Sequence, residues 1–126
     1  MLQIVCCDRN HKTHTQSQMT RLLKQVDAIG SSAYRERKLD SIFNALKSDN
    51  DSLTRKFLFE IALRYEQVNA QQKFMNACKH VYEKAVQQKD TADIAQAHLW
   101  LADGYQRETK LDSAFQHYLQ AENSYR

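Results

Sequence analysis

Apolar side chains recur at steps of three and four residues from about residue 16 to the end of the chain. This spacing places them on one face of an α-helix. Residues that favour turns and caps interrupt the period, most clearly at Gly30 and over residues 47–52. The pattern predicts six amphipathic helices with short links, arranged as three antiparallel pairs over about residues 16–48, 52–88 and 91–126.

Several residues in the links are suited to ending or starting a helix. Gly30 follows the first apolar stretch, and we expect it to end that helix in the left-handed conformation. Ser31 and Ser32 can cap the second helix, and Asp90 can cap the fifth. Asp93 falls in the first turn of the fifth helix, where a negative charge is favourable to the helix dipole.

Residues 1–15 do not follow the helical period, and we expect them to form a poorly ordered arm unless they dock. Cys6, Cys7, His11 and His14 carry side chains that can bind zinc. Adjacent thiolates reach a single metal ion poorly, so we predict no metal site and no cofactor.

The segment before Asp8 is similar to the end of a bacterial lipoprotein signal, in which Cys7 would carry the lipid. Ile4 fits the apolar position three residues earlier, whereas Cys6 stands where a small residue is usual. Two localisations stay open: cytoplasmic, or periplasmic and lipid-anchored if Cys7 belongs to a truncated signal. No run of about 18 apolar residues is present, so no membrane span is predicted.

The composition agrees with a helical domain. The chain has no proline and two glycines, too few for the many turns of a sheet protein or for a glycine-rich phosphate loop. It lacks the G-x-S-x-G, H-E-x-x-H and C-x-x-C motifs, so we predict that it is not an enzyme. The net charge of +3 is spread among interleaved acids and bases, which does not favour direct nucleic-acid binding.

The second and third pairs share an internal repeat. An aliphatic residue, an alanine and a tyrosine recur 40 positions apart: Ile61, Ala62 and Tyr65 match Leu101, Ala102 and Tyr105. A small residue, a tyrosine and an alanine recur 36 positions apart: Cys78, Tyr82 and Ala85 match Ala114, Tyr118 and Ala121. A helix pair is therefore repeated, with four extra residues, about one helical turn, in the earlier copy.

The unit that begins near Ala95 resembles a tetratricopeptide (TPR) repeat, whose pattern starts W-x2-L-G-x2-Y. The matching residues are His98, Leu101, Ala102, Tyr105, Ala114, Tyr118 and Ala121. His98 stands where tryptophan is usual, and Ala102 where glycine is usual. The resemblance is closest over 95–126, weaker over 53–90 and weakest over 16–50. It implies an all-α fold, an α-α superhelix of about three antiparallel helix pairs spanning residues 16–126.

By this resemblance the first helix of each pair would line a concave groove that binds a protein or peptide. The groove residues would be Lys56, Phe59, Leu63, Glu66, Gln67, Gln96, Leu99, Asp103, Gln106 and Arg107. Family members that grip a C-terminal carboxylate use lysine and asparagine, but Leu99 and Asp103 occupy the matching positions in the last unit. We therefore expect a peptide held by apolar anchors and flanking charges.

The segments around Asp90 and Leu111 look like TPR segments of bacterial transcription regulators and sensor kinases, which implies a sensory or scaffold role in signal transduction. Two alternatives stand beside this one. One is a free-standing cytoplasmic adaptor. The other is self-association as a homodimer through the C-terminal end, with Trp100, Phe115, Tyr118 and Tyr125 as interface residues.

Overall fold

The computed structural model describes residues 16–108 and 111–125, which form six α-helices and no strand. The helices are α2 (Gln16–Asp27), α3 (Ser32–Leu46), α4 (Ser52–Gln67), α5 (Gln71–Gln88), α6 (Thr91–Arg107) and α7 (Leu111–Tyr125). The all-helical prediction is thus confirmed for this part of the chain. No helix within it has the length and apolar character that a membrane span needs. The predicted N-terminal arm, with Cys6, Cys7, His11 and His14, lies outside the described residues.

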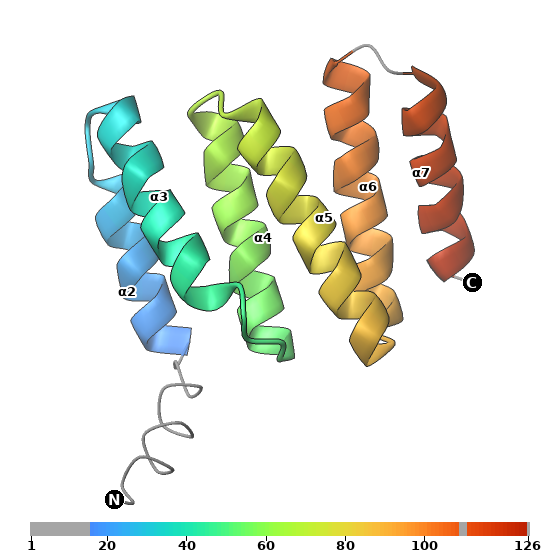
Figure 1. The fold of residues 1–126 in the computed structure, drawn as a ribbon, viewed down its shortest axis with the longest axis horizontal. Coiled ribbons are helices and arrows are strands. Elements are labelled where there is room, and N and C mark those ends of the chain that lie inside the picture. Colours follow the sequence, from blue (N-terminus) through green and yellow to red (C-terminus); the bar gives the residue numbers. More distant parts are fainter. Residues whose placement is uncertain (1–15, 109–110, 126) are drawn as a thin grey trace, which may run out of the picture.

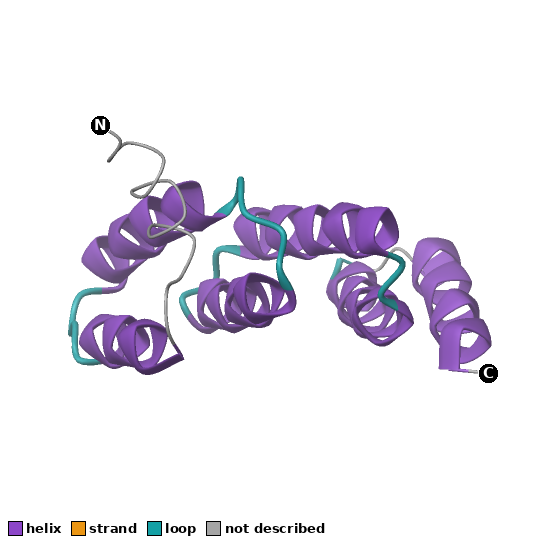
Figure 2. Ribbon diagram, turned by 90° about the horizontal axis from the view of Figure 1, so that it is seen from below, coloured by secondary structure: helices purple, strands orange, loops and turns teal. Residues whose placement is uncertain are grey.

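The helices stand side by side in chain order, and neighbours run antiparallel (Figure 1). Seen along the helices, α3 and α5 lie on one side of the molecule, and α2, α4 and α6 lie on the other (Figure 2). Most packing is between helices adjacent in the chain, with α2 also contacting α4. The three helices α2, α4 and α6 therefore share one long face.

The aliphatic and small residues of the internal repeat occupy equivalent buried positions, whereas of its tyrosines Tyr65 is buried and Tyr82, Tyr105 and Tyr118 are half-buried. Ile61 and Ala62 of α4 are fully buried, as are Leu101 and Ala102 of α6. The small residues of the second helices follow the same rule: Cys78 and Ala85 of α5, and Ala114 and Ala121 of α7, are all buried. Burial raises the pKa of the Cys78 thiol well above its usual range, so this side chain is an inert packing residue.

Gly104 allows α6 to approach α5 closely. A Cβ atom at this position would lie 2.1 Å from Sδ of Met75 and 3.2 Å from Cε2 of Phe74. Both of these side chains are buried, so there is little free space into which they can move. A residue without a side chain is therefore favoured where the two helices meet.

The predicted N-caps are confirmed. The Ser31 hydroxyl accepts a hydrogen bond from the backbone N–H of Tyr34 at 3.3 Å. The Asp90 carboxylate accepts one from the backbone N–H of Asp93 at 3.1 Å.

The predicted left-handed Gly30 is wrong. Helix α2 ends earlier, at Asp27, and Gly30 does not have a positive φ. The link after α2 is held instead by the Arg35 guanidinium, which donates to the carbonyl oxygen of Ile29, so no left-handed glycine is needed. The left-handed residues are Asn69 (φ 63°) and Lys89 (φ 56°), which follow α4 and α5.

Candidate functional site

An apolar hollow lies between the first halves of α4 and α6, on the face shared by α2, α4 and α6. We call it the aromatic hollow, because Phe59, Trp100 and Tyr125 line it. Its volume is about 560 Å³, within the usual range for ligand pockets. The other lining residues are Ser52, Lys56, Glu60, Asp90, Ala92, Asp93 and Gln96. Aromatic walls with a polar rim can hold an apolar side chain and orient the polar groups beside it.

Trp100 forms the wall between α4, α5 and α6. Its ring lies edge-on to Phe59, with centroids 5.2 Å apart, and stacks on Phe74 at 6.1 Å. We predicted it at the C-terminal interface; its ring packs on α4 and α5, and its part in such an interface stays a prediction. His98 of the same helix contacts α7, and two residues along a helix turn the side chain by about 200°.

A second hollow, of about 200 Å³, continues along α4 and α6. We call it the Arg107 hollow, and it is lined by Leu63, Glu66, Phe74, Trp100, Asp103 and Arg107. The Arg107 guanidinium pairs with Glu66 of α4 at 2.6 Å and lies over the Phe74 ring, 4.9 Å from its centroid. Asp103 accepts a hydrogen bond from the Tyr118 hydroxyl of α7 at 2.6 Å. These charged groups hold neighbouring helices together.

A third hollow, of about 350 Å³, lies between α2 and α4 on the same face, and we call it the α2–α4 hollow. Arg64 bridges the two helices. It donates to both carboxylate oxygens of Asp27, at 2.9 and 3.0 Å, and to Glu60 at 2.8 Å. Lys24 and Lys56 also line this hollow. Because Lys56 and Glu60 line the aromatic hollow too, the two hollows adjoin.

The hollows bring together most of the residues that the sequence suggested for a groove. Lys56, Phe59 and Gln96 line the aromatic hollow, whereas Leu63, Glu66, Asp103 and Arg107 line the Arg107 hollow. Three predicted groove residues line none of these hollows: Gln67 is exposed, Leu99 is half-buried, and Gln106 is exposed and accepts from the Tyr118 hydroxyl at 3.1 Å. That any of them binds a partner stays a prediction.

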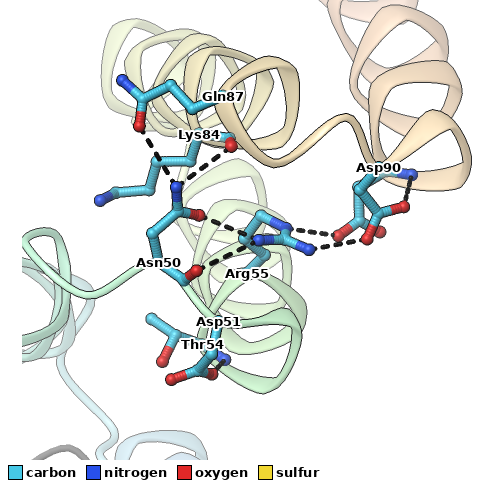
Figure 3. Close-up of polar contacts among 8 residues, drawn as sticks. Asn50, Asp51, Thr54, Arg55, Lys84, Gln87 and Asp90 are labelled. Carbon is cyan, nitrogen blue, oxygen red and sulfur yellow. Dashed lines mark hydrogen bonds and ion pairs between the residues drawn. The ribbon is translucent and has the colours of Figure 1, made fainter.

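Beside the aromatic hollow lies a buried arginine that the sequence pattern did not reveal. Arg55 is 3% exposed, and its guanidinium donates to Asp90 at 2.7 Å and to Asp93 at 2.8 Å (Figure 3). It also donates to the side-chain oxygen of Asn50 at 2.9 Å. The backbone N–H of Asp93 and the Arg55 guanidinium hold the pKa of Asp90 below its usual value.

Asn50 extends this network to α5. Its side-chain nitrogen donates to the carbonyl oxygen of Lys84 and to the Gln87 side chain, both at 3.2 Å (Figure 3). The network therefore joins the start of α4, the end of α5 and the start of α6. It fixes one edge of the aromatic hollow, because Asp90 and Asp93 also line that hollow.

The predicted C-terminal interface residues are spread over α6 and α7, and their role in an interface stays a prediction. Phe115 and Tyr125 are each 61% exposed on α7, and Leu119 is exposed beside them. Tyr118 is half-buried, and its hydroxyl donates to Asp103. Tyr125 also lines the aromatic hollow. Helix α7 packs on α6, and the side that carries Phe115 and Leu119 remains open.

Two histidines meet where α6 and α7 pack. Nδ1 of His98 lies 2.7 Å from Nδ1 of His117, so one ring donates a hydrogen bond to the other. The Tyr82 ring from α5 lies edge-on to His98, and Tyr105 from α6 stacks on His117. Burial lowers the pKa of both histidines; each ring is lowered further by a nearby positive charge, His117 for His98 and Lys79 of α5 for His117.

We expect acid to weaken the packing of α7 on α6. Because the folded-state pKa values lie below the unfolded ones, the unfolded chain binds more protons as pH falls through about 6.5 and below. Each unit of pKa lowering corresponds to about 1.4 kcal/mol of lost stability once the pH is below both values. The melting temperature should therefore fall as the pH is lowered from about 7.5 to about 5, the range in which histidine side chains usually titrate. In the variant His117→Phe this drop in melting temperature should be smaller. Equal drops in the variant and the parent would contradict its assignment to His98 and His117.

Comparisons with known proteins do not extend this description. No family model matches the chain, and no characterised protein or solved structure is significantly similar to it. Within residues 16–108 and 111–125, no group of three or more His, Cys, Asp or Glu side chains is placed to hold a metal ion. A function for this chain therefore has to be inferred from the geometry of the face shared by α2, α4 and α6.

Proposed function

We propose that this chain is a non-catalytic, tetratricopeptide-like interaction module that holds an extended peptide segment of a partner protein along α2, α4 and α6. Its place would be the sensory or scaffold part of a bacterial signalling regulator, as the resemblance of its last unit suggests. The observation that carries the proposal is the aromatic hollow, where Phe59, Trp100 and Tyr125 surround about 560 Å³ of open space. Aromatic side chains are the commonest anchors of peptide binding.

The repeat supports the proposed superhelix. The aliphatic and small residues of the repeat are buried in the same way in α4 and α6, and the small residues likewise in α5 and α7. Units that pack through equivalent residues place their first helices on one face, which is how solenoid proteins form extended binding surfaces. The three adjoining hollows on that face are long enough together for a segment rather than for one small molecule.

Binding, rather than catalysis, suits the chemistry of the aromatic hollow. The carboxylates of Asp90 and Asp93 are held by Arg55, and Glu60 is held by Arg64. A carboxylate that already accepts hydrogen bonds from a guanidinium is poorly placed to take a proton from a substrate as a general base. These groups shape the hollow and give it a polar rim.

The test is to plug the aromatic hollow. Ala92 is an exposed residue on its rim, in the first turn of α6, so Ala92→Tyr fills the hollow and leaves the core untouched. Ala33→Tyr is the matched control, because Ala33 is exposed at the same position of α3. Peptides selected from a random displayed library on the full chain should bind Ala92→Tyr at least about tenfold more weakly, and Ala33→Tyr unchanged. Trp100, the single tryptophan, reports binding by fluorescence.

A second candidate function is self-association, and the exposed Phe115 and Leu119 of α7 favour it. Sedimentation velocity on the same preparation separates the two. If the chain is a monomer and its selected peptides no longer bind Ala92→Tyr, the result supports peptide binding in the groove. A dimer from which no peptide is selected would favour the α7 face and contradict the groove.

A further inference from the structure

The carboxylates that line the groove are all occupied by this chain's own donors. Arg64 holds Asp27 and Glu60, and Arg107 holds Glu66. The others follow the same rule: Arg55 holds Asp90 and Asp93, and the Tyr118 hydroxyl donates to Asp103. Arg55 and Arg64 each balance only one of their two carboxylates, and the Tyr118 hydroxyl is uncharged, so the aromatic and Arg107 hollows keep an excess of negative charge.

The basic side chains that line the hollows are only partly engaged in ion pairs. Arg64 and Arg107 are engaged, but Lys24 and Lys56 line the hollows and make no ion pair with any residue that the structure describes. Both lysines are exposed. Lys56 stands where the aromatic and α2–α4 hollows adjoin, and Lys24 lies farther towards α2. The α2–α4 hollow therefore holds three cations, Lys24, Lys56 and Arg64, against the two carboxylates of Asp27 and Glu60, so the positive charge lies on the α2 side of the aromatic hollow.

We propose that the groove selects peptides in which an acidic residue lies beside an apolar anchor: an aromatic or large aliphatic side chain enters the aromatic hollow, and an aspartate or glutamate close to it in the peptide pairs with Lys56. This inference rests on the proposed function and names the chemistry of its partner. The peptide crosses from α6 towards α2, with its acidic residues on the Lys24 side of the anchor. Complementary charge of this kind sets specificity and association rate.

The spacing of the two sites suits an extended chain. Lys56 and Phe59 are three residues apart on α4, so their side chains are neighbours on the helix surface, about 5–6 Å apart at Cβ. Residues i and i+2 of an extended peptide point to the same side and lie about 7 Å apart. An acidic residue two positions from the anchor therefore reaches the Lys56 ammonium.

The test uses the full chain and the displayed library of random peptides, followed by anisotropy measurements on labelled selected peptides. We expect aspartate or glutamate to be enriched two positions from an aromatic or aliphatic residue. Lys56→Glu removes an attraction and adds a repulsion, so binding should weaken about tenfold. Lys38→Glu makes the same charge change at an exposed site of α3, on the opposite side, and should alter affinity less than about twofold.

The other outcomes separate this inference from the proposed function. One outcome is that the selected peptides show no acidic preference, or bind Lys56→Glu as well as the parent, but no longer bind Ala92→Tyr. This outcome would overturn the inference and still support peptide binding in the groove. Selected peptides that are indifferent to both changes, or the absence of any selected peptide, would overturn both.

Discussion

Replacing Arg55 by methionine is expected to lower the free energy of unfolding by about 3 kcal/mol, which is typical of breaking a buried ion-paired network. Methionine preserves much of the side-chain volume but removes the donors that hold Asp90, Asp93 and Asn50. Two carboxylates would then share one site without a counter-charge. Chemical denaturation followed by far-UV circular dichroism measures the change.

Two variants test the reason for this loss. Arg21→Met makes the same substitution at an exposed position of α2 and should change stability by less than about 0.5 kcal/mol. Adding Asp90→Asn and Asp93→Asn to Arg55→Met removes the uncompensated charge while asparagine still caps α6, so part of the stability should return. If the triple variant is less stable than Arg55→Met, charge compensation is not the role of Arg55.

Replacing Ile61 by alanine is expected to cost about 3–4 kcal/mol. Ile61 is fully buried at the centre of α4, the helix that contacts α2, α3 and α5. Deleting three carbon atoms loses their transfer free energy and leaves a cavity, because neighbours on three sides cannot all move in. Denaturation midpoints for the variant and the parent give the difference.

The matched change is Val86→Ala on α5. Val86 is an apolar residue of similar shape that is exposed at the surface, so its truncation should alter stability by less than about 0.5 kcal/mol. A small effect at Ile61, comparable with that at Val86, would mean that α4 is not a packed central helix.

The sequence predicted the helices well because their signal is local. The apolar period that runs through Leu53, Phe57 and Ile61 reflects one buried face, and a helix has the same period wherever it lies. The caps at Ser31 and Asp90 are local too, since donor and acceptor are three residues apart. Gly30 failed because glycine permits the left-handed conformation but does not require it.

The groove was harder to predict, because its features depend on which residues of different helices meet. Arg55 pairs with residues 35 and 38 positions away, and nothing around it in the sequence distinguishes it from a solvated arginine. The placing of Trp100 depended on the direction in which α6 is rotated, which the period alone leaves open. The division into occupied carboxylates and available lysines likewise emerges only when α2, α4 and α6 lie side by side.

Each helix packs chiefly on the helices next to it in the chain, and this arrangement affects how the molecule folds and how its parts unfold. Contacts of short sequence separation close small loops, so they form early and with little entropic penalty during folding. Helix α7 is joined to the rest through α6, so it can detach without disturbing the interior between α4 and α5. We therefore expect amide hydrogen exchange to be graded rather than uniform, slowest in the middle helices α4 and α5 and faster in the two end helices, α2 and α7.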